Sequence, residues 1–211
     1  MRTASTSCRL ILLLFVCSTV ALSQTINSDD QESSGVASST VYARALASRE
    51  PGVRQEAAEA LARLAAVDQR KLVEGYHVQE KDKKVRLAMD WALFRMGKSD
   101  SLYRIVRELD SSRHDQAVSY LSKVESPTLL YTFLKEKDVS GKIVAGVIEA
   151  LGQLGDSQSL EVINPYRESF LPGVSSAAEA ATDLIEKRLA AAEPAQPSRP
   201  RTVNTTQKDP P

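Results

Sequence analysis

Side chains that commonly carry catalysis or bind metals are scarce in this chain of 211 residues. It has two histidines, His77 and His114, and the residues that follow them are Val78 and Asp115. A metal site needs three or four converging ligands, so we interpret His114 and Asp115 as polar residues in the first turn of a helix. A nucleophilic triad would have to recruit one of the same two histidines, and no supporting motif surrounds either of them.

Cysteine chemistry is also excluded from most of the chain. The two cysteines, Cys8 and Cys17, both lie in the apolar N-terminal segment, so the remainder has no disulfide, cysteine metal site or cysteine nucleophile. The sequence has no Gly-x-Ser-x-Gly motif, phosphate-binding glycine loop or His-Glu-x-x-His motif. Its 27 acidic residues are too many to single out a catalytic pair. We therefore predict a protein without catalytic residues, metal or cofactor.

The elements that would position any functional residue follow a repeated pattern. In residues 51–64, PGVRQEAAEALARL, apolar residues occur at the spacing of one helix face. We call this spacing of apolar residues the repeat frame, and it occurs four more times in the chain. One equivalent position serves as the anchor of each copy; the anchors are Leu61, Leu93, Leu121, Leu151 and Thr182, at intervals of 32, 28, 30 and 31 residues. A polar break and a second apolar segment follow each of the first four anchor helices. A period near thirty with two helices per copy indicates a solenoid, in which stacked repeats bury a continuous core.

The copies begin with residues suited to a helix N-terminus. Pro51 follows Glu50 in the first copy, where the missing N–H of proline is tolerated. Asp82, Asp110 and Ser140 occupy the equivalent places in the next three copies. Their short side chains can accept hydrogen bonds from the free amides of a first helical turn, so we expect helices to start there.

Two stretches of these copies carry a family resemblance. Val53-Arg54 and Val85-Arg86 match the opening of the short HEAT-like repeat of the phycobilin lyase type, and residues 150–156, ALGQLGD, match its close. The resemblance covers roughly residues 50–190. It implies an all-α fold, a right-handed α-solenoid of about five two-helix HEAT-like repeats. Repeats of this kind serve lyases, hydroxylases and plain interaction proteins, so the resemblance implies no single function.

The resemblance leaves two functional classes open. HEAT-type hydroxylases that hold two irons use repeated His-Glu pairs, which this sequence lacks. A non-catalytic scaffold or adaptor that binds a protein or peptide partner is the function we predict. The alternative is a ligand-binding or lyase-like enzyme on the same scaffold, in which a concave surface would hold a tetrapyrrole.

The N-terminal residues are typical of a secretory signal. Residues 1–23 combine Arg2 and Arg9 with an apolar run from Leu10 to Leu22, and small residues stand before Gln24, where we expect cleavage. The run is shorter than the about 20 residues of a membrane span. An uncleaved anchor and a lipoprotein modified at Cys17 remain alternatives. We expect an exported protein, periplasmic or secreted, with no stable membrane insertion after cleavage.

Composition divides the rest of the chain. Residues 24–38 are polar and acidic and predict a flexible linker. The repeats would occupy residues 39–191, with a capping helix at 41–47 over the open edge of the first one. Residues 192–211 contain five of the nine prolines and predict a disordered tail. The 27 basic and 27 acidic residues balance, so we expect no nucleic-acid partner.

Candidate partner-binding residues lie on the second helices. Tyr103 with Arg107, and Tyr131 with Lys135, are tyrosine and cation pairs four residues apart at the same place in adjacent repeats. Tyrosine and arginine are enriched at protein interfaces, so this strip is a candidate docking surface. The other interpretation is an ordinary amphipathic surface whose tyrosines are half-buried between helices.

Two irregular positions in the first helices are also candidates. Trp91, the single tryptophan, stands where the other copies have polar or small residues. It would anchor a partner or a second copy, or else lie under the C-terminal tail or fill a gap between repeats. The third copy departs most from the frame, with Arg113 at an apolar position and Tyr120 where other copies have alanine. Such a departure marks a functional site or a bend.

Overall fold

The computed structural model describes residues 38–136 and 139–192. Over these ranges the chain forms helices, turns and short loops and no strand, which confirms the predicted all-α class. The predicted signal peptide, the linker up to residue 37 and the tail from residue 193 onward lie outside the described residues. No helix within the described ranges is long and apolar enough to cross a membrane.

The helices of the described chain are α1 (residues 38–45), α2 (Pro51–Leu64), α3 (Arg70–Gln79), α4 (Lys83–Arg95), α5 (Asp100–Arg107), α6 (His114–Leu121), α7 (Thr128–Lys135), α8 (Gly141–Leu154), α9 (Ser157–Ile163) and α10 (Val174–Ala192). Short 3₁₀ turns are η1 (Val67–Gln69), η2 (Glu108–Asp110) and η3 (Asn164–Glu168).

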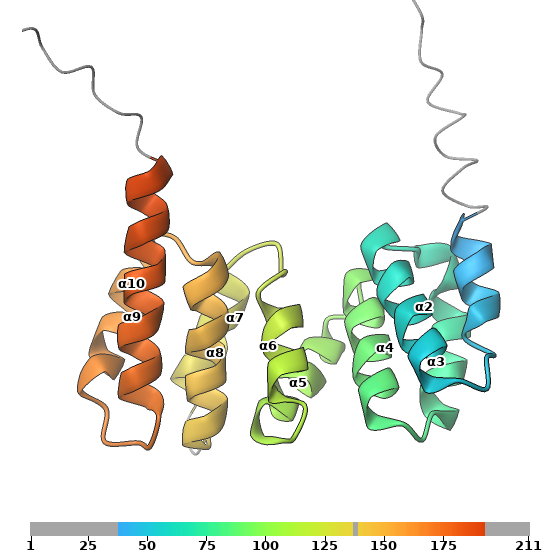
Figure 1. Cartoon of the computed structure of the whole chain (residues 1–211), viewed down its shortest axis with the longest axis horizontal. Helices are drawn as coiled ribbons and strands as arrows, with labels where there is room; N and C mark the ends of the chain where they lie inside the picture. The colour runs from blue at the N-terminus through green and yellow to red at the C-terminus, as the bar shows by residue number, and fades with distance from the viewer. Residues whose placement is uncertain (1–37, 137–138, 193–211) are drawn as a thin grey trace, which may run out of the picture.

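The anchor helices α2, α4, α6, α8 and α10 stand side by side in one row (Figure 1). Contacts are extensive between α2 and α4 and between α8 and α10, and α6 packs on α8. The second helices cover the row, since α3 and α5 pack on α4, α7 on α8, and α9 on α10. Contact between α4 and α6 is much less extensive.

Most of the predicted helix starts are present. Pro51 opens α2, the Asp82 carboxylate accepts from the amides of Lys84 and Val85 at the start of α4, and Ser140 caps α8. The prediction for Asp110 is wrong, because this residue belongs to η2 and α6 begins later, at His114. The η2 segment is held by an ion pair between Glu108 and Arg113.

The anchor positions form the core, as the repeat frame predicts. Leu61, Leu93, Leu121 and Leu151 are at most 1 % exposed. Thr182 is half-buried and donates its hydroxyl to Ala178 O in its own helix. Burying each leucine contributes roughly 1.5–3 kcal/mol, so the shared frame accounts for much of the cohesion between neighbouring repeats.

Two glycines of α8 allow other helices to approach closely. A Cβ on Gly146 would lie 2.7 Å from Leu109 Cδ2 and 2.9 Å from His114 Cε1. A Cβ on Gly152 would lie 3.0 Å from Ala181 Cα of α10. Because these two positions have no side chain, η2 and the start of α6 can approach α8 on one side and α10 can approach it on the other.

Candidate functional site

The predicted docking strip on the second helices is only partly on the surface. Tyr103 is 54 % exposed and packs its ring edge-on against Phe133, with ring centroids 4.9 Å apart. Arg107 and Lys135 are exposed. Tyr131 instead is 8 % exposed, and its hydroxyl shares a 2.8 Å hydrogen bond with Ser159 Oγ of α9. The two tyrosines therefore do not form one exposed surface, and partner binding by this strip stays a prediction.

Trp91 lies inside the row of anchor helices. It is 5 % exposed and stacks on Tyr120 of α6 with a centroid distance of 5.6 Å and an interplanar angle of 4°. It also stacks on Phe94 within α4. Trp91 thus fills the space between neighbouring repeats, one of the interpretations that its sequence position left open, and most of its ring does not reach the surface.

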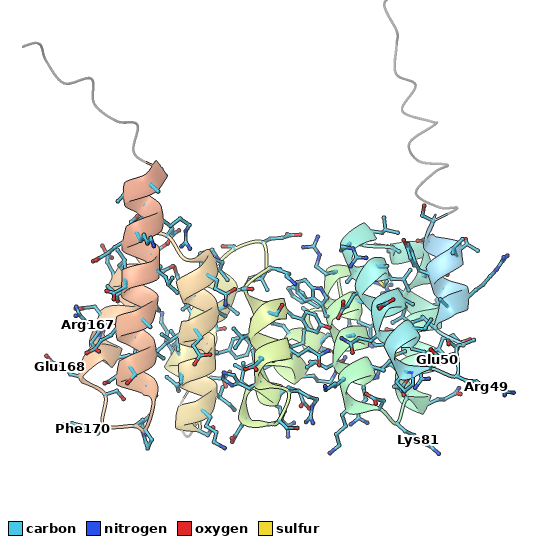
Figure 2. All side chains as sticks on the ribbon, viewed as in Figure 1. Arg49, Glu50, Lys81, Arg167, Glu168 and Phe170 are labelled. Atoms are coloured by element: carbon cyan, nitrogen blue, oxygen red, sulfur yellow. The ribbon has the colours of Figure 1, made fainter. Side chains whose placement is uncertain are left out.

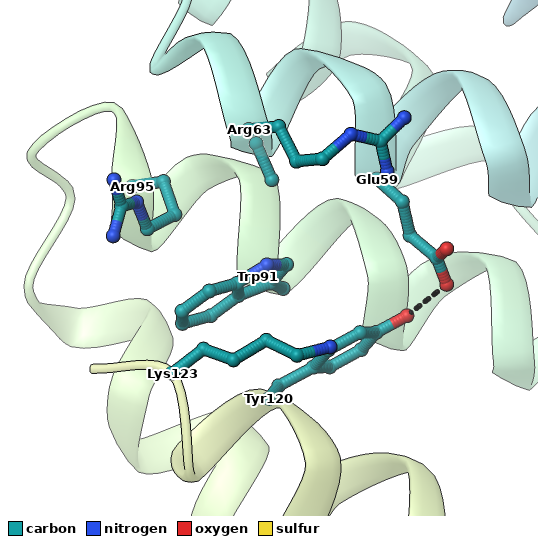
Figure 3. Close-up of a pocket in the computed structure, with 7 residues that line it drawn as sticks. Glu59, Arg63, Trp91, Arg95, Tyr120 and Lys123 are labelled. Atoms are coloured by element: carbon teal, nitrogen blue, oxygen red, sulfur yellow. Dashed lines mark hydrogen bonds between the residues drawn. The ribbon is translucent and has the colours of Figure 1, made fainter. Parts of the chain in front are cut away.

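A cavity of about 300 Å³ opens beside this aromatic stack, between α2, α4 and α6 (Figure 3). It lies where α4 and α6 make little contact with each other. Its lining residues are Glu59, Ala62, Arg63, Trp91, Arg95, Tyr120 and Lys123. Three successive anchor helices therefore contribute side chains to one site.

The cavity is bordered by three cations. Arg63 and Arg95 lie in the last turns of α2 and α4, and Lys123 follows the end of α6. Positive charge is favourable at a helix C-terminus because of the helix dipole. The Arg95 guanidinium lies 5.7 Å from the centroid of the Trp91 ring, and Lys123 Nζ lies 5.9 Å from that of Tyr120. Cation–π attraction of this kind helps to hold both side chains over the rings.

A hydrogen bond crosses the cavity from α6 to α2. Tyr120 Oη donates to Glu59 Oε1 over 2.6 Å (Figure 3). Burial raises the pKa of the Tyr120 phenol well above its ordinary value, so the hydroxyl keeps its proton at neutral pH. Gln55 Nε2 also donates to Glu59 Oε1, over 2.9 Å, and Gln116 Nε2 donates to Tyr120 Oη. The bond ties α6 to α2.

The lining of the cavity carries more positive than negative charge. Three cations and one carboxylate line the cavity, and that carboxylate accepts hydrogen bonds from Tyr120 and Gln55. The phenol of Tyr120 keeps its proton at neutral pH, because burial raises its pKa, and it is therefore not a free base. Among the described residues, no group of three or more His, Cys, Asp or Glu side chains is placed to hold a metal ion.

Sequence reasoning missed the three cations, although the repeat frame contains them. Arg63, Arg95 and Lys123 each stand two residues after the anchor leucine of their copy. Alignment of the copies on their anchors therefore places a basic residue at the same point of three successive repeats. Tyr120 was recognised as irregular, and the structure places it in the cavity wall.

The two histidines lie next to carboxylates away from this cavity. His77 Nε2 lies 3.0 Å from the buried Asp90 carboxylate, which also accepts from Arg104 of α5. His114 contacts Leu109 O and the Glu149 carboxylate of α8, each at 2.8 Å. Burial lowers the pKa of His114, but these two partners outweigh it and raise the pKa above its ordinary value.

The ends of the row carry other exposed groups (Figure 2). Arg49, Glu50 and Lys81 lie at one end, and Arg167, Glu168 and Phe170 lie at the other. Phe170 is fully exposed in the loop before α10, next to the exposed Leu171. Lys81 lines a cavity together with Arg54 and Glu80, and Arg167 lines another together with Glu168 and Glu179, so carboxylates lie beside the cations at both ends.

Comparison with known proteins gives no assignment. No protein-family model matches this sequence, and no curated protein is significantly similar to it. Membership of a HEAT-like repeat family therefore stays a prediction from the repeated residues.

Proposed function

We propose that this chain is a non-catalytic binding module, an α-solenoid of about five HEAT-like repeats that holds a protein or peptide partner in an extracytoplasmic compartment. Its repeats would act as a scaffold, and the cavity between α2, α4 and α6 would be the main contact site. The repeated helix frame and the row of packed anchor helices support the solenoid. The signal-like residues 1–23 support export.

One observation carries the proposal: three successive repeats place a cation at the same position around one cavity. Arg63, Arg95 and Lys123 come from separate helices, yet all three line the cavity beside Trp91 and Tyr120. Arginine, tryptophan and tyrosine dominate the energetics of protein interfaces. A site assembled from several repeats is also typical of solenoids, which bind through surfaces that extend along the array.

The same cavity favours binding over catalysis. General acid–base catalysis works best when the pKa of the group lies near the operating pH. Burial raises the pKa of Tyr120, which moves it further away from neutral pH. Its hydroxyl proton is also donated in a hydrogen bond to Glu59. These two side chains hold the repeats together and shape the cavity wall.

A ligand-binding or lyase-like enzyme remains the second candidate. The cavity volume of about 300 Å³ favours it to a limited extent, since small-molecule sites begin at about this size. A coloured or ligand-loaded purified protein would support that candidate.

Selection from a random peptide library displayed on phage tests the proposed function. The bait is the mature chain, and each selected peptide is then measured by calorimetry against two variants. Arg63→Gln/Arg95→Gln/Lys123→Gln removes the cavity cations, and Lys71→Gln/Arg107→Gln/Lys135→Gln removes three exposed cations of the second helices.

We expect selected peptides to bind the parent and the second-helix variant and to lose affinity for the cavity variant. Loss in the second-helix variant alone would move the binding site to the strip around Tyr103. Failure to select any peptide would contradict the binding-module proposal. Circular dichroism and thermal unfolding of each variant establish that it is folded.

A further inference from the structure

We propose that the cavity between α2, α4 and α6 recognises an acidic peptide in an extended conformation, whose carboxylates pair in turn with Arg63, Arg95 and Lys123. The inference rests on the proposed binding function and assigns the ligand class to that site. Three observations support it: the cations have few ion-pair partners, two of them are held over aromatic rings, and they come from neighbouring helices.

The cavity cations lack strong partners of their own. Within the described ranges, neither Arg63 nor Lys123 has a carboxylate at ion-pair distance, and Arg95 has one, Glu125, at 3.9 Å. The Glu125 side chain is 83 % exposed and is free to move aside. Arg54, in contrast, donates two hydrogen bonds to Glu80 and one to each of two backbone carbonyls. An incoming carboxylate would therefore have to displace only the Glu125 carboxylate from these cations.

Two of the cations are positioned before any ligand arrives. Arg95 lies over the Trp91 ring and Lys123 over the Tyr120 ring, and Lys123 Nζ also donates to Ser119 Oγ over 3.1 Å. Both rings are buried and stacked on each other. Side chains that are already restrained lose less conformational entropy on binding, which raises affinity for a matching ligand.

Glu59 directs an anionic ligand toward the cations. Its carboxylate lines the same cavity but accepts from Tyr120 and Gln55. Because it carries the same charge as the ligand, it disfavours ligand carboxylates at its own end of the cavity. The ligand is therefore expected along the line of the three cations, across the C-terminal ends of α2, α4 and α6.

The spacing of the helices selects the spacing of the ligand charges. Packed helices lie about 8–10 Å apart, and α2 and α4 are packed in this way. A polyproline II peptide rises about 3.1 Å per residue with three residues per turn, so every third side chain falls on one face at intervals of roughly 9 Å. A peptide with an acidic residue at every third position thus matches the spacing of α2 and α4, which carry Arg63 and Arg95, and leaves a third carboxylate for Lys123, which follows α6.

Three synthetic peptides test this inference. The first has three Glu-Pro-Pro units, the second has Gln in place of Glu, and the third has the composition of the first with its glutamates adjacent. Trp91 is the single tryptophan and lines the cavity, so its fluorescence reports binding, and calorimetry gives the affinity. The protein is the mature chain and the two cation variants described above.

We expect the Glu-Pro-Pro peptide to bind the parent at least tenfold more tightly than the Gln peptide, and more tightly than the peptide with adjacent glutamates. The cavity variant should lose about tenfold in affinity and the second-helix variant should lose none. Rising salt should weaken binding, since the pairs are near the surface. A Lys-Pro-Pro peptide that binds Arg63→Glu/Arg95→Glu, but not the parent, would confirm the charge pairing.

Equal affinity for the Glu and Gln peptides, or equal loss in both variants, would overturn the inference. So would tighter binding of a single-stranded oligonucleotide than of the acidic peptide. If phage selection yields cavity-dependent ligands that are not acidic, only the ligand class is wrong and the binding module stands. If neither selection nor the acidic peptides give binding, both proposals fail.

Discussion

Replacement of Tyr120 by phenylalanine tests whether the bond across the cavity holds the repeats together. The change removes one hydroxyl, which donates to Glu59 Oε1 at 2.6 Å, and leaves the buried ring in its stack on Trp91. A hydrogen bond to a charged group contributes about 1.5–3 kcal/mol. The lower end applies, because Glu59 Oε1 still accepts from Gln55 and Glu59 is only half-buried.

Urea denaturation followed by circular dichroism measures this effect. With a denaturant slope of about 2 kcal/mol per M, a loss of about 1.5 kcal/mol lowers the midpoint by roughly 0.8 M. Tyr131→Phe is the matched control, since it removes a bond between neutral hydroxyls worth about 1 kcal/mol and Ser159 Oγ retains Asp156 as a partner.

The comparison between the two variants decides the outcome. If Tyr120→Phe costs no more than Tyr131→Phe, the bond from α6 to α2 is not a charge-assisted bridge, and the reasoning fails. A double-mutant cycle with Glu59→Gln isolates the contribution of the Glu59 charge to this bond, because the glutamine amide oxygen can still accept. It should show coupling between the two side chains and none between Tyr131 and Glu59.

Three further predictions concern the packing and charge of the repeats. Gly146→Ala should destabilise the fold by about 1–3 kcal/mol, because its Cβ would lie 2.7 Å from Leu109 Cδ2, whereas Gly52→Ala, which meets nothing within 4 Å, should not; urea denaturation distinguishes them. Arg104→Ala leaves the buried Asp90 carboxylate with His77 alone and should cost about 3 kcal/mol, and a cost no larger than that of Lys98→Ala, which removes a surface ion pair, would count against this. The pKa of His114 is raised above 6.5 in the folded chain, so its stabilising contribution is complete below about pH 6.5 and disappears as pH rises through the folded pKa. The difference in Tm between the parent and His114→Gln should accordingly be larger at pH 5.5 than at pH 8, and an equal difference at both would contradict the assignment.

The part of the fold that could be predicted from the sequence is the part that follows the repeated apolar spacing. Helix starts at Pro51, Asp82 and Ser140 and burial of the anchor leucines depend on local chemistry and periodicity, which a single sequence contains. The start of α6 was missed, because the ion pair between Glu108 and Arg113 stabilises an extra turn that a spacing rule does not include.

The candidate site was harder to predict, because its parts meet only through packing between repeats. Tyr103 and Tyr131 hold equivalent sequence positions, yet Tyr131 is buried because its hydroxyl reaches Ser159 in the next repeat. Tyr103 stays exposed beside Phe133. The burial of Trp91 likewise depends on Tyr120, 29 residues later in the chain. The equivalent positions of Arg63, Arg95 and Lys123 could be found by aligning the copies of the repeat. That the three side chains line one cavity is visible only in the structure.

Chemical-shift mapping with a selected or acidic peptide tests the central claim most directly. Because Trp91 is the single tryptophan, its indole N–H gives one resolved signal in a proton–nitrogen correlation spectrum of the chain expressed from Gln24 onward. The proposed function predicts that this signal and the backbone amides of Arg63, Arg95 and Lys123 shift on titration, while those of Tyr103, Arg107 and Lys135 do not. Shifts confined to the second helices, or no shift with any peptide, would contradict a binding site between α2, α4 and α6.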